Sequence, residues 1–214
     1  MSAAPVRRRY TGLAPVERTR QRRIALLEAA LDRYGVDGYQ ATSVKRLCQQ
    51  AALTERYFYE SFGDREECLA ALYDRLVHDM RSATLAAMAE ATEAGASDIA
   101  TIVRSGLAGF VNYLTEDPRR ARVVLVEVVG VSPAMEQRRH GVLREFADIV
   151  MNVWSAMEAE QTPQARHLTA VALVGAVNHL LVYWLMAGRQ EDPDELTATC
   201  ASLFTAAFEW SQDP

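Results

Sequence analysis

Two short helical patterns separated by a tight break, within residues 42–69, constrain this chain more than any other feature of its sequence. Ser43 can cap a first helix, in which apolar residues recur at helical spacing. After a break around Ala52, Thr54 can cap a second helix over 55–61, whose outer face carries polar and aromatic side chains. Two short helices joined by such a turn predict a helix-turn-helix.

Polar residues at characteristic positions mark where further helices begin. Asp64, with Glu67 three residues on, predicts a capping box. Asp, Ser or Thr precedes Pro at four later points, which is the pattern of a capped helix start. Residues 123–129 have the composition of a strand, but the capped start before them and the lack of a second strand favour a helix. The fold class is therefore all-α with about nine helices; those expected outside the helix-turn-helix are 16–34, 65–94, 98–115, 118–129, 134–158, 163–188 and 193–210.

The charge of the chain is divided unevenly between two parts. Residues 1–65 carry 12 Lys and Arg against 7 Asp and Glu, whereas residues 66–214 carry 11 against 21. We therefore expect a domain boundary here, between a basic arm with a helix-turn-helix DNA-binding domain and an acidic helical body that DNA does not contact. A solvated basic tail with ordinary surface charge elsewhere is the alternative that charge alone leaves open.

Several classes of protein are disfavoured by what the sequence lacks. Three cysteines without C-x-x-C spacing and an N-terminus without an apolar run indicate a cytoplasmic chain. The histidines are scattered and no catalytic or phosphate-binding motif occurs, so we expect no enzyme, no metal site and no cofactor. Residues 168–188 are apolar over a length that could span a bilayer, but Asn178 and His179 interrupt them. We expect a buried helix of a soluble protein there, not a membrane span.

The helix-turn-helix and the residues just before it resemble the tetracycline-repressor (TetR) family of bacterial regulators. The residues that carry the resemblance are Leu31, Tyr34, Gly38, Tyr39, Thr42, Val44, Leu47, Ala51, Leu53, Thr54, Phe58, Tyr59, Phe62, Arg65, Glu66 and Leu69. Three positions depart from the family's pattern: Ala52 stands where Gly is usual, Cys48 replaces a small Ala, and Ser61 replaces His or Tyr. If φ is positive at Ala52, alanine adopts this turn only at some cost.

The resemblance implies DNA contacts position by position. Glu55, Arg56 and Tyr57 begin the recognition helix, where the family reaches base edges in the major groove. Lys45 matches a position on the preceding helix that also reaches a base. The positions that match phosphate contacts, which set register without reading sequence, are Ser43, Thr54, Tyr59, Ser61 and Arg65. Packing on the core of the DNA-binding domain is the alternative role for Tyr57 and Tyr59.

By the same resemblance, the body binds a small-molecule effector and dimerises through its last two helices. The candidate effector-binding residues are Phe110, Tyr113, Glu127, Phe146, Met151, Trp154, Asn178, His179, Tyr183 and Trp184. The polar candidates Glu127, Asn178 and His179 lead, because an unpartnered buried polar group costs about 1–3 kcal/mol. A satisfied interhelical hydrogen bond or a place at the dimer seam is the alternative for these three, and plain core packing is the alternative for the rest. The expected buried side of the last helix consists of Leu203, Phe204, Ala207 and Trp210.

The sequence thus indicates a homodimeric transcriptional regulator. The expected activity is repression at a palindromic operator, relieved when an effector changes the spacing of the two DNA-binding domains. Glu127 favours an effector with a cationic or hydrogen-bond-donating group. A helical ligand-binding or enzyme-like protein whose helix-turn-helix no longer binds DNA is the alternative.

Overall fold

The computed structural model describes residues 15–156 and 163–210, and within these ranges every regular element is a helix. The expected all-α fold is confirmed, and most helix ends lie within a few residues of their predicted positions. One predicted cap, Thr162, lies outside the described residues. The elements are α1 (Pro15–Val36), α2 (Val44–Gln50), α3 (Glu55–Tyr59), α4 (Arg65–Glu93), α5 (Ile99–Glu116), α6 (Pro118–Arg122), the π-helix η1 (Val123–Glu127), α7 (Pro133–Ala156), α8 (Pro163–Met186) and α9 (Pro193–Trp210).

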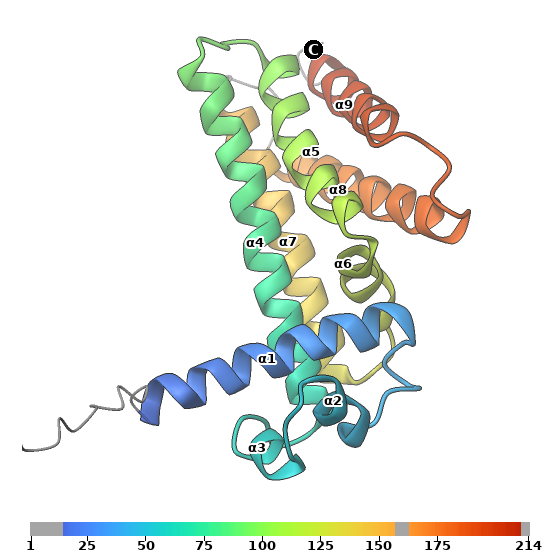
Figure 1. Ribbon diagram of the computed structural model, residues 1–214. Coiled ribbons are helices and arrows are strands. Elements are labelled where there is room, and N and C mark those ends of the chain that lie inside the picture. Colours follow the sequence, from blue (N-terminus) through green and yellow to red (C-terminus); the bar gives the residue numbers. More distant parts are fainter. Residues whose placement is uncertain (1–14, 157–162, 211–214) are drawn as a thin grey trace, which may run out of the picture.

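The helices form a small head at one end and a larger body, and α4 connects the two (Figure 1). We call α1–α3 the head and the remaining helices the body. In the head, α1 packs on both short helices, and the side chains buried between them include Leu26, Leu47, Phe58 and Phe62, each at most 1% exposed. In the body, α5 packs along α4 and against α9, while α7 packs against α8. The head therefore has a closed apolar core, from which α4 extends along the body.

The predicted caps form in most cases, with two differences in detail. Ser43 accepts a hydrogen bond from the Arg46 amide at 3.3 Å, but Thr54, at the equivalent position of α3, makes no side-chain cap bond. Asp64 caps α4 by accepting from the amide of Glu67 at 2.8 Å. The Glu67 carboxylate returns to the amide of Gly63 at 2.7 Å, not to that of Asp64, so the predicted capping box is shifted by one residue. The orphan amides at the start of α4 are satisfied all the same.

The helix predicted over 118–129 changes type in its second half. The stretch is helical, as expected, but α6 gives way to the π-helix η1 at Val123. Val123, Val124 and Leu125 are all buried, at 0, 6 and 7% exposure. The i→i+5 turn rotates less per residue than an α-helix, so consecutive apolar side chains can face the interior together. The strand-like run of residues is thus accommodated by a wider helical turn.

The helix α8 is apolar on nearly every side. It is the one helix in the described ranges that is long and apolar enough to cross a membrane, and 28% of its apolar window is buried in the protomer. It packs against α7 and α9, which buries Leu173, Val177 and Leu181. Its opposite side leaves large apolar side chains exposed, so this single chain does not complete the burial of α8.

Candidate nucleic-acid interface and ligand cavity

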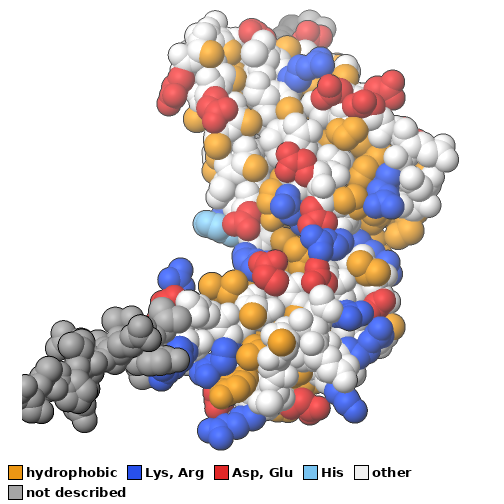
Figure 2. Space-filling model, in the orientation of Figure 1, with side chains coloured by type: hydrophobic (Ala, Val, Ile, Leu, Met, Phe, Trp, Pro, Cys, Tyr) orange, Lys and Arg blue, Asp and Glu red, His pale blue; other side chains and the backbone are white. Residues whose placement is uncertain are grey.

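The outer face of α2 and α3 presents polar and charged side chains to solvent. Arg56 has 83% of its side chain exposed and donates from Nε to Glu60 at 3.0 Å. Lys45 and Glu55 are also exposed, as is 56% of Tyr59. Figure 2 shows Lys and Arg side chains around the lower end of the molecule, where α2 and α3 lie. Because an exposed i,i+4 ion pair is worth little, the Arg56 guanidinium is free to exchange Glu60 for a base edge.

Arg65, predicted to contact phosphate, is built into the head. Its Nη1 donates to the carbonyl oxygen of Tyr39 at 3.0 Å and also to that of Thr42, and its guanidinium lies 4.5 Å from the centre of the Tyr39 ring. Burial raises the pKa of Tyr39, and Arg65 partly offsets that rise. Arg65 therefore holds the loop between α1 and α2 against the start of α4, whatever it contributes to DNA.

Two other predicted positions are likewise engaged within the head. The Ser61 hydroxyl donates to the carbonyl of Tyr57 at 3.0 Å, and the Tyr57 ring lies 4.2 Å below the guanidinium of Arg22. Arg23 donates to the Ser61 carbonyl at 2.6 Å. Arg22 and Arg23 thus brace α3 against α1, a role that the sequence analysis did not assign to them. Ser43 and Thr54, the remaining phosphate candidates, are exposed at the starts of the two short helices.

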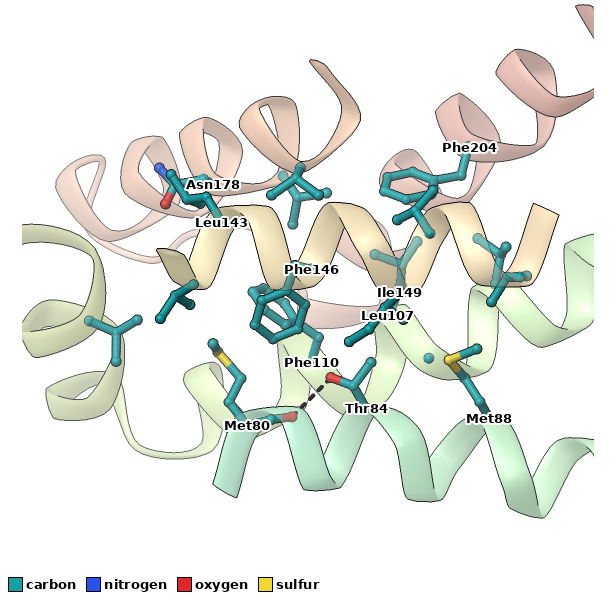
Figure 3. Close-up of a pocket in the computed structure, with 18 of the residues that line it drawn as sticks. Met80, Thr84, Met88, Leu107, Phe110, Leu143, Phe146, Ile149, Asn178 and Phe204 are labelled. Carbon is teal, nitrogen blue, oxygen red and sulfur yellow. Dashed lines mark hydrogen bonds between the residues drawn. The ribbon is translucent and has the colours of Figure 1, made fainter. Parts of the chain in front are cut away.

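A long apolar cavity lies in the body between α4, α5, α7 and α8, with η1 contributing to one wall (Figure 3). The space between its side chains, including the part open to solvent, is about 890 Å³. The rings of Phe110 and Phe146 meet edge to face inside it, with centroids 5.2 Å apart. Asn178 and Leu143 lie at one end of the view, and Met88 and Phe204 lie toward the other. The lining, mostly apolar with a few polar groups, is that of a small-molecule site.

The cavity follows the helices for several turns. Its lining residues on α7 extend from Arg139 to Trp154, and those on α4 extend from Tyr73 to Met88. Fifteen residues of helix rise about 22 Å, so the cavity is a slot and not a sphere. Such a slot fits an extended apolar chain better than a compact ring system.

Few polar groups face the slot. The Thr84 hydroxyl donates to the carbonyl of Met80 at 2.9 Å and is therefore occupied. Burial raises the pKa of Tyr73, so its hydroxyl stays protonated and available as a donor at neutral pH. Trp154 is fully buried, and its Nε1 has no hydrogen-bond partner among the described residues. Together with the Asn178 amide, these groups could orient a ligand that carries hydrogen-bond acceptors.

Of the ten effector-binding candidates, four line the slot: Phe110, Phe146, Trp154 and Asn178. The other six do not. The Tyr113 ring lies under Arg120 at 4.5 Å, Trp184 donates from Nε1 to the Glu191 carbonyl at 3.1 Å, and Met151 is half-buried outside the lining. His179 and Tyr183 are exposed on α8.

Glu127, the leading polar candidate, lies at the junction of body and head instead of in the cavity. One carboxylate oxygen accepts from the amide of Tyr39 at 2.7 Å and the other from Nε of Arg122 at 2.9 Å. Only 12% of its side chain is exposed. The expectation of a cationic or donor group on the effector, which depended on Glu127 facing the cavity, therefore loses its basis.

Much of the lining on α4 and α5 was not predicted. Met80, Thr84 and Met88 recur every four residues on α4, facing Gly106 of α5, where an added Cβ would meet the Met88 side chain at 2.7 Å. The sequence signal that could have located this wall is the helical spacing of the flexible Met side chains on one helix, together with a glycine inside the next helix.

Comparisons with known proteins agree on the fold. Residues 26–72 match the sequence profile of the bacterial regulatory proteins, tetR family. The comparison with curated proteins gives no match. Solved structures with the same arrangement include the transcriptional regulator FadR from Bacillus subtilis in complex with stearoyl-CoA, which is 15% identical, with a TM-score of 0.74 over 85% of this chain and 96% of that one.

Two further solved structures are similar over most of both chains. The fatty acid degradation regulator FadR from Bacillus halodurans is 17% identical, with a TM-score of 0.70 over 91% of this chain and 96% of its own. A TetR-like transcriptional regulator from Rhodococcus sp. RHA1 is 20% identical, with a TM-score of 0.67 over 88% and 96%. At such identities the likeness establishes the fold, including the body as well as the head.

Proposed function

We propose that this chain is a TetR-type repressor, without enzymatic activity, that binds a palindromic operator as a homodimer. The observation that carries the proposal is the exposed face of α2 and α3, where Arg56, Lys45 and Glu55 stand clear of the head's own core. A small-molecule effector in the slot between α4, α5 and α7 would release the operator. A DNA-bound regulator of this kind acts in the cytoplasm.

The contacts with DNA divide into two kinds. Arg56 is positioned to read guanine by a bidentate pair, with Glu55 as an acceptor for cytosine and Lys45 as a second base contact. Ser43, Thr54 and Tyr59 would contact phosphates, which set register without reading sequence. Tyr57, Ser61 and Arg65 support this face from within the head by the contacts described above.

The exposed side of α8 supports the proposed dimer. Leu168, Val171, Tyr183 and Met186 are 43–64% exposed there, and an added Cβ at Gly175 between them would meet nothing within 4 Å. Gly175 leaves room for the close approach of a second helix. An isologous dimer would bury this apolar face. On α9, the exposed residues Leu203 and Trp210 would also be buried in the proposed dimer. Phe204 is 5% exposed and lines the slot of its own protomer, so it would not contribute to the dimer.

The shape of the slot supports a chain-like effector. An extended polymer backbone advances about 1.2 Å per bond, so a length of about 20 Å holds some 16 bonds of an extended chain. The Bacillus subtilis FadR of the same fold binds stearoyl-CoA. We therefore propose a long aliphatic chain with a polar head group as the class of effector, with the tail along α4 and α7.

Gel retardation with duplexes selected from random DNA tests the proposal. Arg56→Ala should relax the preference at one base position by about 1–3 kcal/mol, while Arg65→Ala should weaken all duplexes alike. Arg104→Ala, which removes an exposed arginine of the body, is the matched control and should change nothing. Stearoyl-CoA should release the retarded complex, whereas free CoA should not. Failure to retard any duplex, with the protein folded, would instead support the helical ligand-binding protein whose head no longer binds DNA.

A further inference from the structure

We propose that Glu127 links the wall of the ligand slot to the helix-turn-helix, through the backbone of the loop between α1 and α2. We call the group formed by Glu127, Arg122, the Tyr39 amide and the Val36 carbonyl the Glu127 clasp. The inference rests on the proposed function, because it assigns the route by which an occupied slot acts on the head.

The clasp joins two parts of the chain that are 88 residues apart. Glu127 receives the Tyr39 amide at 2.7 Å and Nε of Arg122 at 2.9 Å, and Nη1 of Arg122 donates to the carbonyl of Val36 at 2.8 Å. Arg122 thus holds the end of α1 at a C=O group, and Glu127 holds the following loop at an N–H group. A backbone hydrogen bond to a partly buried carboxylate is among the stronger kinds, and its loss leaves the Tyr39 amide without its acceptor.

A glycine in the loop between α1 and α2 leaves room for this carboxylate. Gly38, directly before Tyr39, has φ of 91°, and a Cβ there would lie 3.2 and 3.3 Å from the two Glu127 oxygens. Glycine is needed at this point both for its backbone conformation and for the approach of the acid. On the other side of the loop, the Tyr39 carbonyl accepts from Arg65 at the start of α4. A displacement of Tyr39 would therefore reach both the start of α4 and the loop that leads into α2.

The body end of the clasp begins in the wall of the slot. Val124 and Leu125 line the slot, and Glu127 ends the same π-helix two residues later. A π-helical turn is rare compared with an α-helical turn and occurs often at functional sites. A ligand that presses on Val124 and Leu125 would shift η1, and Glu127 would carry that shift to Tyr39.

The ion pairs that do join head and body lack a connection to the slot. Glu28 of α1 pairs with Arg75 of α4 at 2.8 Å, but the Glu28 side chain is 59% exposed. Asp32 pairs with Arg119 of α6 and is 38% exposed. Neither acid lies on a wall of the slot, whereas Glu127 is 12% exposed and lies on η1. Glu28 therefore offers a matched control: an acid between the same two units, without the link to the slot.

Amide hydrogen exchange on the full-length protein, without DNA or ligand, tests the clasp. Glu127→Gln keeps the size of the side chain but removes its charge, and it should raise the exchange rate of the Tyr39 amide by about tenfold or more. Glu28→Gln should leave that amide unchanged. Leu125→Ala, on the slot side, should also raise exchange at Tyr39, and it should add little in the Glu127→Gln background because the route is already broken. Circular dichroism would verify that each variant is folded.

The outcomes separate this inference from the proposed function. Unchanged exchange at Tyr39 in Glu127→Gln, or an undiminished effect of Leu125→Ala in that background, would overturn the clasp. A second measurement uses selected duplex DNA with stearoyl-CoA as the probe: Glu127→Gln should bind stearoyl-CoA within about twofold of the parent protein, yet lose most of the release of DNA. Normal release would also overturn the clasp. If the parent protein binds no DNA, the proposed function fails while the exchange result still decides the clasp.

Discussion

The head and the body bury their apolar side chains to different degrees, and the difference separates what the chain completes alone from what it leaves for partners. In the head, Phe58 and Phe62 are at most 1% exposed, Arg22 and Arg23 brace α3 against α1, and Arg65 of α4 holds the loop between α1 and α2. The body leaves an apolar slot between α4, α5 and α7 and an uncovered apolar side of α8. Protein interiors are otherwise close-packed, so these two features support the proposals that the body binds an effector and a second copy of the chain.

The head, by contrast, has a completed interior and offers only its polar outer face. A rigid unit of this kind suits the docking of a fixed set of side chains on DNA, where geometry decides which base is read. Under the proposed function, the looser packing of the body would let it change shape when it binds an effector. The predictions below test this contrast from the largest effect to the smallest.

The largest effect should come from a charge on the uncovered side of α8. Ala176→Arg places a guanidinium in the proposed dimer seam, where an unpaired buried charge costs about 3–5 kcal/mol, so the dissociation constant of the dimer should rise about 100-fold or more. Sedimentation velocity over a range of concentrations measures it. Ala86→Arg, at an equally exposed alanine of α4, should leave the dimer intact. A dimer that withstands Ala176→Arg would move the seam away from α8.

Replacing a phenylalanine by alanine should lower the free energy of unfolding by different amounts in the head and in the body. Phe58→Ala removes a fully buried ring that contacts Tyr59 and Phe62, and it should cost about 3–5 kcal/mol of unfolding free energy. Phe146→Ala removes a ring that already borders empty space, so its cost should be less than half of that. Urea unfolding at one fixed protein concentration compares the two. Equal losses would mean that the slot is closed in solution and that the contrast between head and body is wrong.

The parts of the fold that the sequence predicted are those decided within a few residues. A polar cap followed by proline determines a helix start locally, which is why α6, α7 and α9 begin where expected. The helix-turn-helix is likewise encoded in one short segment. The exposure of Arg56 and Lys45 could be predicted from that segment alone, because it follows from the spacing of the buried residues around them; their proposed DNA contacts came from the family resemblance.

The remaining features depend on contacts that no local pattern contains. Glu127 accepts a hydrogen bond from Tyr39, 88 residues earlier in the chain. Arg65 donates to the carbonyl of the same residue, in the loop between α1 and α2. The slot exists where packing between α4, α5 and α7 is incomplete, so its lining cannot be separated from ordinary core by residue type. Phe110 and Phe146 line it, while Trp184, equally aromatic, is plain core.

The smallest predicted effect concerns the turn of the helix-turn-helix, where Ala52 has φ of 53°. An alanine in this left-handed region costs about 1–2 kcal/mol, whereas glycine tolerates it but loses about 0.5–1 kcal/mol more conformational entropy on folding. Ala52→Gly should therefore stabilise the head by about 0.5 kcal/mol, seen as a small rise in the urea midpoint. Ala51→Gly is the control in the same turn, because φ is −78° there and glycine relieves no backbone strain. It should destabilise the head by about 0.5–1 kcal/mol. Shifts of the same sign in both variants would show that the turn relaxes in solution, and that the head is less rigid than its closed core indicates.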